Sequence, residues 1–309
     1  MKRIKSNKKN IINVVNNTIG IISGFFGIVE YITSNTIIKS LFLVFASIYI
    51  GFLIYKVASY IKNYIDAKQE YIERTIEVGK YLHKFEHNIR DDMGFGDEEI
   101  SNRDFFINLC KSICNDTQSV IASLLDDDKV SVSIKKIITD EFVDTNYLEW
   151  QVETIARCSK SDPKRDRDSS PKYISENSYL EIIVSPDYVD TVFVSQNLIN
   201  ITTDFIKFYN KQYTNSTKNY LKYYKSTIVV PIRIEASKIG AELAGTLPNN
   251  LQYYVIGFLC IDSLKTYDDS QLFYAAEEFS KTIADSIYKL FEKNIIAVLN
   301  KEARGWNTL

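Results

Sequence analysis

Two histidines and two cysteines in this chain have a spacing that suits a metal site. His83 and His87 are four residues apart, and so are Cys110 and Cys114. Residues four apart share one face of a helix, so each pair presents two ligands on the same side. Two imidazoles and two thiolates suit tetrahedral zinc, which we predict here if the two helices fold back antiparallel. The alternative is that both cysteines are buried as small apolar side chains.

Patterns typical of enzymes are absent from the sequence. It holds no nucleophile elbow, Walker motif, dinucleotide-binding glycine motif or EF-hand loop. The segment FEHNIRDDM, around His87, resembles the phospho-acceptor box of histidine kinases only in part, because no proline follows it. The acidic run 126–128 reads as a solvated helix end rather than a metal site. We therefore expect a protein that is not an enzyme.

The charge balance and the cysteine content indicate which binding partners and which cellular compartment to expect. The 309 residues carry 37 basic and 39 acidic side chains, so nothing draws the chain as a whole to nucleic acid. The length allows one or two domains. The four cysteines, which include Cys158 and Cys260, show no disulfide-framework spacing and fit a reducing compartment.

Two long apolar segments lie near the N-terminus. Residues 11–32 carry no charge before Glu30, and residues 41–55, LFLVFASIYIGFLIY, carry none. A helix of about 20 apolar residues crosses a membrane. We predict a transmembrane hairpin over residues 1–62, with spans at about 11–32 and 37–61. The alternative for the first segment is a signal peptide, but no small-residue cleavage site follows it.

Basic residues predict the orientation of this hairpin in the bilayer. Five precede the first span, and Lys56, Lys62 and Lys68 lie at or beyond the end of the second, whereas Lys39 alone lies near the turn between the spans. The positive-inside rule then places both termini in the cytoplasm, in a multi-pass protein of the cell membrane. Polar residues within the first span either bond the two spans together or line a polar path in an oligomer. They are Asn13, Asn16, Asn17 and Glu30.

A helical stalk and hinge are predicted over residues 63–100. Residues 60–90 contain no proline and a single glycine, and apolar residues recur near heptad a and d positions. Polar residues interrupt the repeat, so it predicts a weak coiled coil that forms a homodimer. The alternative is a solvated helix packed on its own domain. The acidic, glycine-containing segment 91–102 predicts a break before the next helix.

The remainder of the chain predicts an α+β domain over residues 101–296, followed by a tail at 297–309. Alternating and apolar runs predict five strands, of which one is short. The expected strands are 130–138, 148–156, 192–194, 226–234 and 255–263, and the expected helices are 105–125, 175–184, 203–213 and a last one from 271. We expect residues 159–172 to form a polar surface loop and 215–224 a tyrosine-rich linker.

The last of these elements resemble the end of a GAF domain. The resemblance is carried by VVPIRI (229–234), VIGFLCIDS (255–263) and the helix FYAAEEFSKTIADSI (273–287). It implies a GAF-like antiparallel sheet flanked by helices, in a sensor domain; related folds such as PAS are the alternative. Cyclic-nucleotide-binding members have an Asn-Lys pair where this chain has Asp262 and Ser263, so that ligand is not carried over.

The same resemblance implies where a ligand would lie. In GAF-like domains the ligand rests over the sheet and under the mid-domain loops, here roughly residues 159–224. Polar candidates in and beside this segment are Arg157, Tyr179, Asn197 and Asp204. Taken singly, each of these residues is more often an ordinary surface or capping residue, and such a pocket can also be collapsed in domains that only dimerise.

Two functions from different classes follow from these features. In the first, the chain is a membrane-anchored cytoplasmic sensor that binds a small molecule or a protein partner. Its signal passes through rearrangement of the dimer and the stalk. In the second, the domain gates the hairpin into a pore or a membrane-disrupting effector.

Overall fold

The computed structural model describes most of the chain. The described residues are Gly20, Ser23, Gly24, Gly27, 36–92, 94–138, 147–165, 170–185, 192–235, 253–267 and 271–306. The polar residues predicted within the first span, Asn13, Asn16, Asn17 and Glu30, lie outside them, and so does most of that span. The chain divides into two compact units, Met1–Ile76 and Glu77–Leu309. Each unit is considered by itself.

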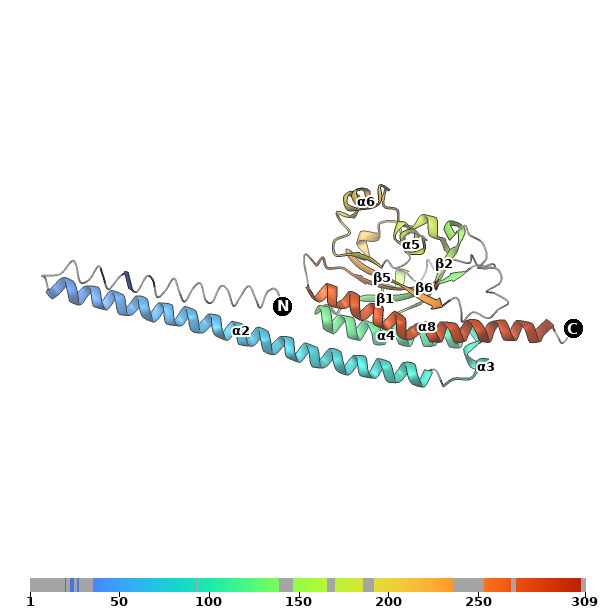
Figure 1. Cartoon of the computed structure of the whole chain (residues 1–309), viewed down its shortest axis with the longest axis horizontal. Helices are drawn as coiled ribbons and strands as arrows, with labels where there is room; N and C mark the ends of the chain where they lie inside the picture. Colours follow the sequence, from blue (N-terminus) through green and yellow to red (C-terminus); the bar gives the residue numbers. More distant parts are fainter. Residues whose placement is uncertain are drawn as a thin grey trace. The chain divides into compact units, whose positions relative to one another are not determined.

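One helix, α2, runs without a break from Thr36 to Asp92 (Figure 1). Its apolar part reaches a mean hydropathy of 1.6 over 18 residues, none of them buried. By length and composition, it is the one helix of the described residues that could cross a membrane. The second predicted span falls within it. The hairpin and the multi-pass topology stay predictions.

The C-terminal part of α2 belongs to the second unit. Val78, Phe85 and Ile89 are 4%, 1% and 8% exposed, because they pack into the core of that unit. Asn88 Nδ2 donates a 2.6 Å hydrogen bond to Asp116 of α4, Arg103–Leu125. The compact unit therefore begins before the boundary predicted at residue 101. Over residues 77–92, the helix is packed on its own domain.

The segment predicted as a hinge is fastened to the same unit. It contains the short helix α3, Asp97–Ile100. Asn294 Nδ2 donates a 2.7 Å hydrogen bond to the carbonyl of Ile100, and Asn294 is 3% exposed. Asn102 then caps α4, since its Oδ1 accepts from the backbone N–H groups of Asp104 and Phe105.

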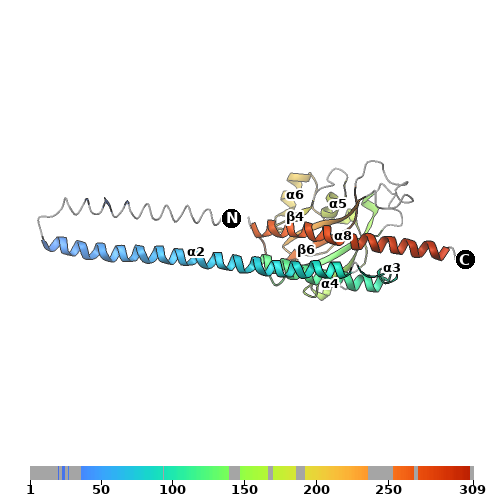
Figure 2. The same cartoon turned by 60° about the horizontal axis from the view of Figure 1, so that its bottom comes forward.

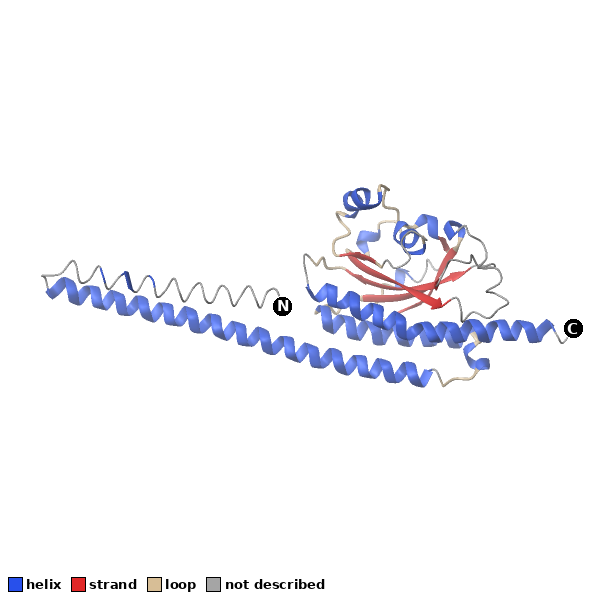
Figure 3. Ribbon diagram, viewed as in Figure 1, coloured by secondary structure: helices blue, strands red, loops and turns tan. Residues whose placement is uncertain are grey.

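The described strands form one sheet in the order β3-β2-β1-β6-β5-β4, and each pair is antiparallel (Figure 3). The long central strand β6 is buried on both faces, as its unbroken apolar sequence predicts. The strands are β1 Ser131–Ile138, β2 Gln151–Arg157, β3 Lys172–Tyr173, β4 Phe193–Ser195, β5 Ser226–Glu235 and β6 Tyr253–Ser263.

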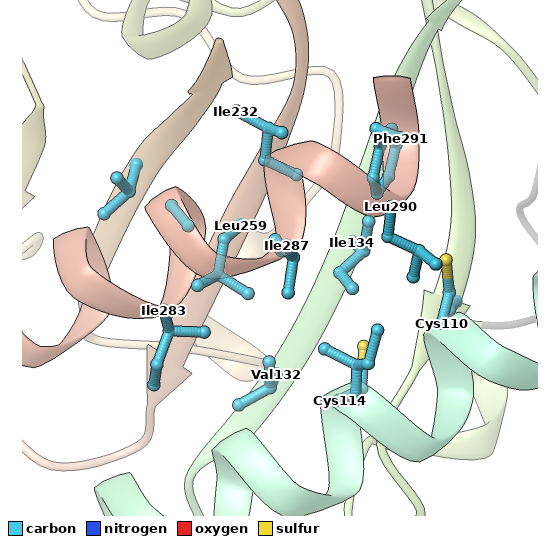
Figure 4. Close-up of a cluster of buried hydrophobic side chains, with 14 of the residues drawn as sticks. Cys110, Cys114, Val132, Ile134, Ile232, Leu259, Ile283, Ile287, Leu290 and Phe291 are labelled. Atoms are coloured by element: carbon cyan, nitrogen blue, oxygen red, sulfur yellow. The ribbon is translucent and has the colours of Figure 1, made fainter. Parts of the chain in front are cut away.

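Helices cover both faces of this sheet. On one face lie α4 and the long α8, Gln271–Trp306, side by side in both views (Figures 1 and 2). On the other lie α5, Ser178–Val184, and α6, Ile201–Tyr209. The apolar stripe predicted on α8 faces the sheet, with Ile283, Ile287 and Leu290 fully buried. Figure 4 shows them against Val132, Ile134 and Leu259.

A bulge in β6 changes which side chains face the helices. Ile232 pairs with Gly257 but Arg233 pairs with Val255, so Ile256 is an extra residue. Ile256 therefore joins Leu259 in the core beneath α4 and α8, whereas Val255 lies on the opposite face with Phe258 and Cys260. Strict alternation along the strand would have put Val255 on the face of Leu259.

Candidate ligand-binding pocket

A pocket lies on the sheet face away from α4 and α8. Its cavity volume is about 50 Å³. A single water needs about 10–15 Å³ of such space, so there is room for a few waters or one small ion. Residues of β1, β2, β3, β5, β6 and α5 line it together with two loop segments. They include Lys135, Thr154, Arg157, Arg165, Lys172, Asn177, Tyr179, Tyr213, Ser216, Thr217, Tyr224, Thr227, Cys260 and Asp262.

Positive side chains outnumber negative ones in this lining. Among the described lining residues, Lys135, Arg157, Arg165 and Lys172 are basic, and Asp262 is the one carboxylate. Four minus one leaves a formal charge of +3, within a chain whose net charge is −2. A concave site with one sign of charge concentrates ions of the opposite sign. The pocket therefore favours an anion.

Arg157 reaches the pocket because of a bulge in β2. Ile134 of β1 pairs with Ala156, but Lys135 pairs with Thr154, so Ile155 is an extra residue. Ile155 and Ala156 both pack towards the helices. Thr154 and Arg157, three residues apart, then share the pocket face, and Arg157 Nη2 lies 3.4 Å from Thr154 Oγ1. Strict alternation would have put Arg157 on the other face.

Lys135 stands in the floor of the pocket, on β1. Its Nζ donates a 2.9 Å hydrogen bond to Tyr179 Oη of α5. Burial lowers the pKa of Lys135, and the positive charges of Arg157 and Arg165 lower it further against the opposite effects of Cys260 and Asp262. Both arginines therefore lie close enough to disfavour the charged form of Lys135, which a nearby anion would favour.

Arg165 and Asp262 form a buried ion pair at the pocket. Arg165 Nη1 lies 3.1 Å from Asp262 Oδ2, and their side chains are 10% and 7% exposed. Thr227 Oγ1 donates a 2.7 Å hydrogen bond to Asp262 Oδ1. Burial lowers the pKa of Arg165, but Asp262 outweighs this and raises it. The segment predicted as a surface loop thus sends a side chain into the interior.

Tyrosines close the pocket against α5. Arg165 lies over the ring of Tyr224 at 5.1 Å from the centroid. Asn215 Nδ2 donates a 2.8 Å hydrogen bond to Tyr224 Oη, and Tyr213 stacks near Phe193 of β4. Burial raises the pKa of both tyrosines, so they stay neutral at pH 7. The segment predicted as a polar linker therefore forms part of a core.

The four predicted ligand residues separate into two pairs. Arg157 and Tyr179 line the pocket, 22 positions apart in sequence but on neighbouring elements. Asn197 instead caps a turn, because its Oδ1 accepts a 3.0 Å hydrogen bond from the N–H of Ile199. Asp204 is exposed on α6. The pocket thus contains two of the four, and their role in binding stays a prediction.

The four predicted zinc ligands are not brought together. Cys110 and Cys114 are fully buried in the core beneath the sheet, where Figure 4 shows them on α4. His83 and His87 are exposed on α2, and their rings contact each other edge to face at 4.5 Å. Among the described residues, no group of three or more His, Cys, Asp or Glu is placed to hold a metal ion. The cysteines behave as small apolar residues.

The chain has a structural likeness to a solved protein domain. No family model and no curated protein sequence matches the chain. Among solved structures, the chain is similar to the GAF domain of an Acinetobacter phosphoenolpyruvate-protein phosphotransferase. The match has a TM-score of 0.35 and 13% identity, and it covers 68% of this chain and 90% of that one. A likeness at this level decides neither ligand nor activity.

Proposed function

We propose that this chain is a membrane-anchored signalling protein whose C-terminal domain binds a small anion. The observation that carries the proposal is the pocket, where four basic side chains from separate elements surround about 50 Å³ of space. Burying a charged side chain costs free energy, and this partly buried site contains four basic ones. Binding of an anion accounts for that placement, because it offsets the burial and the neighbouring positive charges that together lower the pKa of Lys135.

The GAF-like character supports a sensory role over a catalytic one. The order of strand β5, strand β6 and helix α8 is the order that the resemblance to GAF domains implies. The nucleophilic groups of the pocket lining are poorly activated, since burial raises the pKa of Cys260 and of Tyr179. We therefore propose a binding domain rather than an enzyme.

The signal would leave the domain through α2. This helix continues unbroken from its apolar part into the segment that packs on the domain through Phe85 and Ile89. A rearrangement of the domain would shift that segment, and with it the predicted stalk and dimer. We propose that the apolar part anchors the chain in the cell membrane with both termini in the cytoplasm.

Thermal unfolding of the full chain in detergent tests the binding step. Phosphate, sulfate and acetate are added at equal ionic strength, with sodium chloride as reference. A ligand at a hundred times its Kd stabilises a protein by about 2.7 kcal/mol, so at least one of these anions should raise the Tm. Phosphate and sulfate also stabilise proteins generally, which makes a matched variant necessary.

Arg157→Gln removes one charge from the pocket, and Lys222→Gln removes the same charge from an exposed site outside it. We expect Arg157→Gln to abolish the anion-specific rise in Tm and Lys222→Gln to retain it. Equal rises in the wild type and in Arg157→Gln would show that the pocket is not the binding site.

A further inference from the structure

We propose that Lys135 is a covalent attachment site, whose side-chain amine forms a reversible imine with the carbonyl group of a small aldehyde or oxo acid in the pocket. Aldehydes and oxo acids share this chemistry, because each presents a carbonyl carbon to the amine. The inference goes beyond the proposed function, since it depends on the surroundings of one amine and needs no charge on the ligand.

Lys135 extends from β1 into the pocket. It lies on the sheet face of Ile137 and Cys260, and its side chain is partly buried and lines the cavity. The cavity of about 50 Å³ holds a few waters, which a carbonyl compound of about two or three carbon atoms would replace. A small molecule in the cavity therefore meets the amine.

The hydrogen-bond partner of Lys135 is a neutral hydroxyl. Its Nζ donates to Tyr179 Oη at 2.9 Å and lies 5.3 Å from the centroid of the same ring. Lysines inside proteins are ordinarily paired with a carboxylate, because an unpaired ammonium is costly away from water. In the described part of the lining, the one carboxylate is Asp262, which is paired with Arg165 at 3.1 Å. A lysine that only supported the fold would be expected to have such a partner.

These surroundings favour the neutral amine, which is the nucleophilic form of lysine. Burial lowers the pKa of Lys135 most, and the positive charges of Arg157 and Arg165 lower it further. Burial has the opposite consequence for Cys260 and Tyr179, because it raises their pKa values and their nucleophilic forms are the charged ones. Burial therefore activates Lys135 but deactivates the other two nucleophiles.

Imine formation needs no oxidant, reductant or further reactant. The lone pair of Nζ forms a bond to the carbonyl carbon, the π electrons of the carbonyl move to its oxygen, and a proton passes from the nitrogen to that oxygen. This hydroxyl group then leaves with the second proton of the nitrogen as water, and a C=N bond forms. Tyr179 Oη, 2.9 Å from Nζ, is within reach to donate a hydrogen bond to the carbonyl oxygen as charge develops on it. Addition of water reverses the step, so the event is binding without turnover.

Reductive trapping on the full chain in detergent tests the proposal, with glyoxylate and glycolaldehyde as the probes. Sodium cyanoborohydride converts an imine into a stable secondary amine, and mass spectrometry of peptides then measures the labelled fraction of each lysine from neutral to alkaline pH. Lys136 is the matched control, because it is the next residue of β1 and burial lowers its pKa as well. Its Nζ lies 3.4 Å from Asn294 Oδ1, and it does not line the pocket.

We expect both probes to label Lys135 at neutral pH and to leave Lys136 unlabelled, because Lys136 has no cavity beside its amine. Exposed Lys222 should be labelled only at higher pH, where an ordinary lysine loses its proton. Without the reductant, the probes should raise the Tm of the wild type but not that of Lys135→Met, which keeps the aliphatic stem and removes the amine.

An unlabelled Lys135, or a pH profile of its labelling that coincides with that of Lys222, would overturn the proposal. Both results come from the wild type, so they stand even where Lys135→Met fails to fold. The two probes have the same number of carbon atoms and differ in charge. Preferential labelling by glyoxylate would support both the imine and the proposed function, whereas labelling by glycolaldehyde alone would support the imine and contradict the preference for an anion.

Discussion

At the scale of single residues, Asp127 joins the end of α4 to the end of β6. Its carboxylate, 2% exposed, accepts hydrogen bonds from Ser263 Oγ and from Tyr267 Oη at 2.9 Å. Asp126 before it has a left-handed backbone with φ 53°, which turns the chain there. Burial raises the pKa of Asp127, but the hydrogen bonds outweigh it and the pKa falls below its ordinary value. For Asp127, the prediction of a solvated helix end is therefore wrong.

This pKa predicts how the stability of the domain depends on pH. Since the folded pKa lies below the unfolded one, the stabilisation is fully present above the ordinary pKa of 3.8 and is lost as the pH falls through the folded pKa. We expect Asp127→Asn to lower the free energy of unfolding by about 2 kcal/mol at pH 7. Urea unfolding at pH 7 and pH 3 should show this deficit shrinking in acid. A deficit independent of pH would contradict the role of the charge.

Gly257 lies where β6 passes closest to β1. A Cβ built there would be 2.4 Å from the carbonyl oxygen of Lys135, which is backbone and cannot move aside. We expect Gly257→Ala to lower the free energy of unfolding by about 2–3 kcal/mol. Gly79→Ala is the matched control, because nothing lies within 4 Å of its Cβ position on α2. It should stabilise the protein by up to about 1 kcal/mol. Equal effects in denaturant titrations would contradict the close approach of β6 to the backbone of β1.

At the scale of elements, α2 serves two units with different surroundings. Phe85 is 1% exposed in the core of the second unit, whereas Ile72 is 47% exposed in the first. We expect Phe85→Ala to cost the domain about 3–5 kcal/mol. Ile72→Ala should change domain stability by less than about 0.5 kcal/mol.

Both variants are compared by tryptophan fluorescence during urea unfolding, since Trp150 packs against the apolar cluster on the pocket face of the sheet. A loss in Ile72→Ala as large as that in Phe85→Ala would place the whole helix in one cooperative unit. The oligomeric state of Ile72→Ala, measured by sedimentation, tests the predicted pairing of stalks separately.

The long regular elements could be predicted from the sequence because periodicity reports burial directly. The alternation in β5 and the three- and four-residue steps in α8 located both elements. The bulges at Ile155 and Ile256 could not be predicted in this way, since an extra residue in a strand leaves no turn signal. Each bulge reverses the face of the residues beyond it, and so it decides which side chains reach the pocket.

The candidate site could be predicted only in part. Arg157 and Tyr179 could be predicted, because the pocket was expected to lie over the sheet near them. Arg165 could not, because its contact with Asp262 spans 97 positions and starts from a charged segment of a type that is usually solvated. The sequence alone shows that Asp262 and Ser263 stand where cyclic-nucleotide-binding GAF domains have an Asn-Lys pair. That Asp262 forms an internal ion pair became clear only from the structure.

At the scale of the whole molecule, one chain carries both an apolar helix and the domain that we propose to bind an anion. We expect the full chain to stay with membranes after carbonate extraction. A chain without residues 1–62 should become extractable, because the apolar window of α2 would be lost. Retention of the shortened chain would contradict anchoring by this segment. Release of dye from liposomes by the full chain would favour the pore-forming alternative.

The central claim is that the pocket holds an anion, and an experimental structure of the full chain with saturating phosphate tests it most directly. We predict a bound phosphate ion with its oxygens within about 3.2 Å of the side-chain nitrogens of Lys135, Arg157 and Arg165. A pocket that contains water alone, under conditions where phosphate is bound elsewhere, would contradict it.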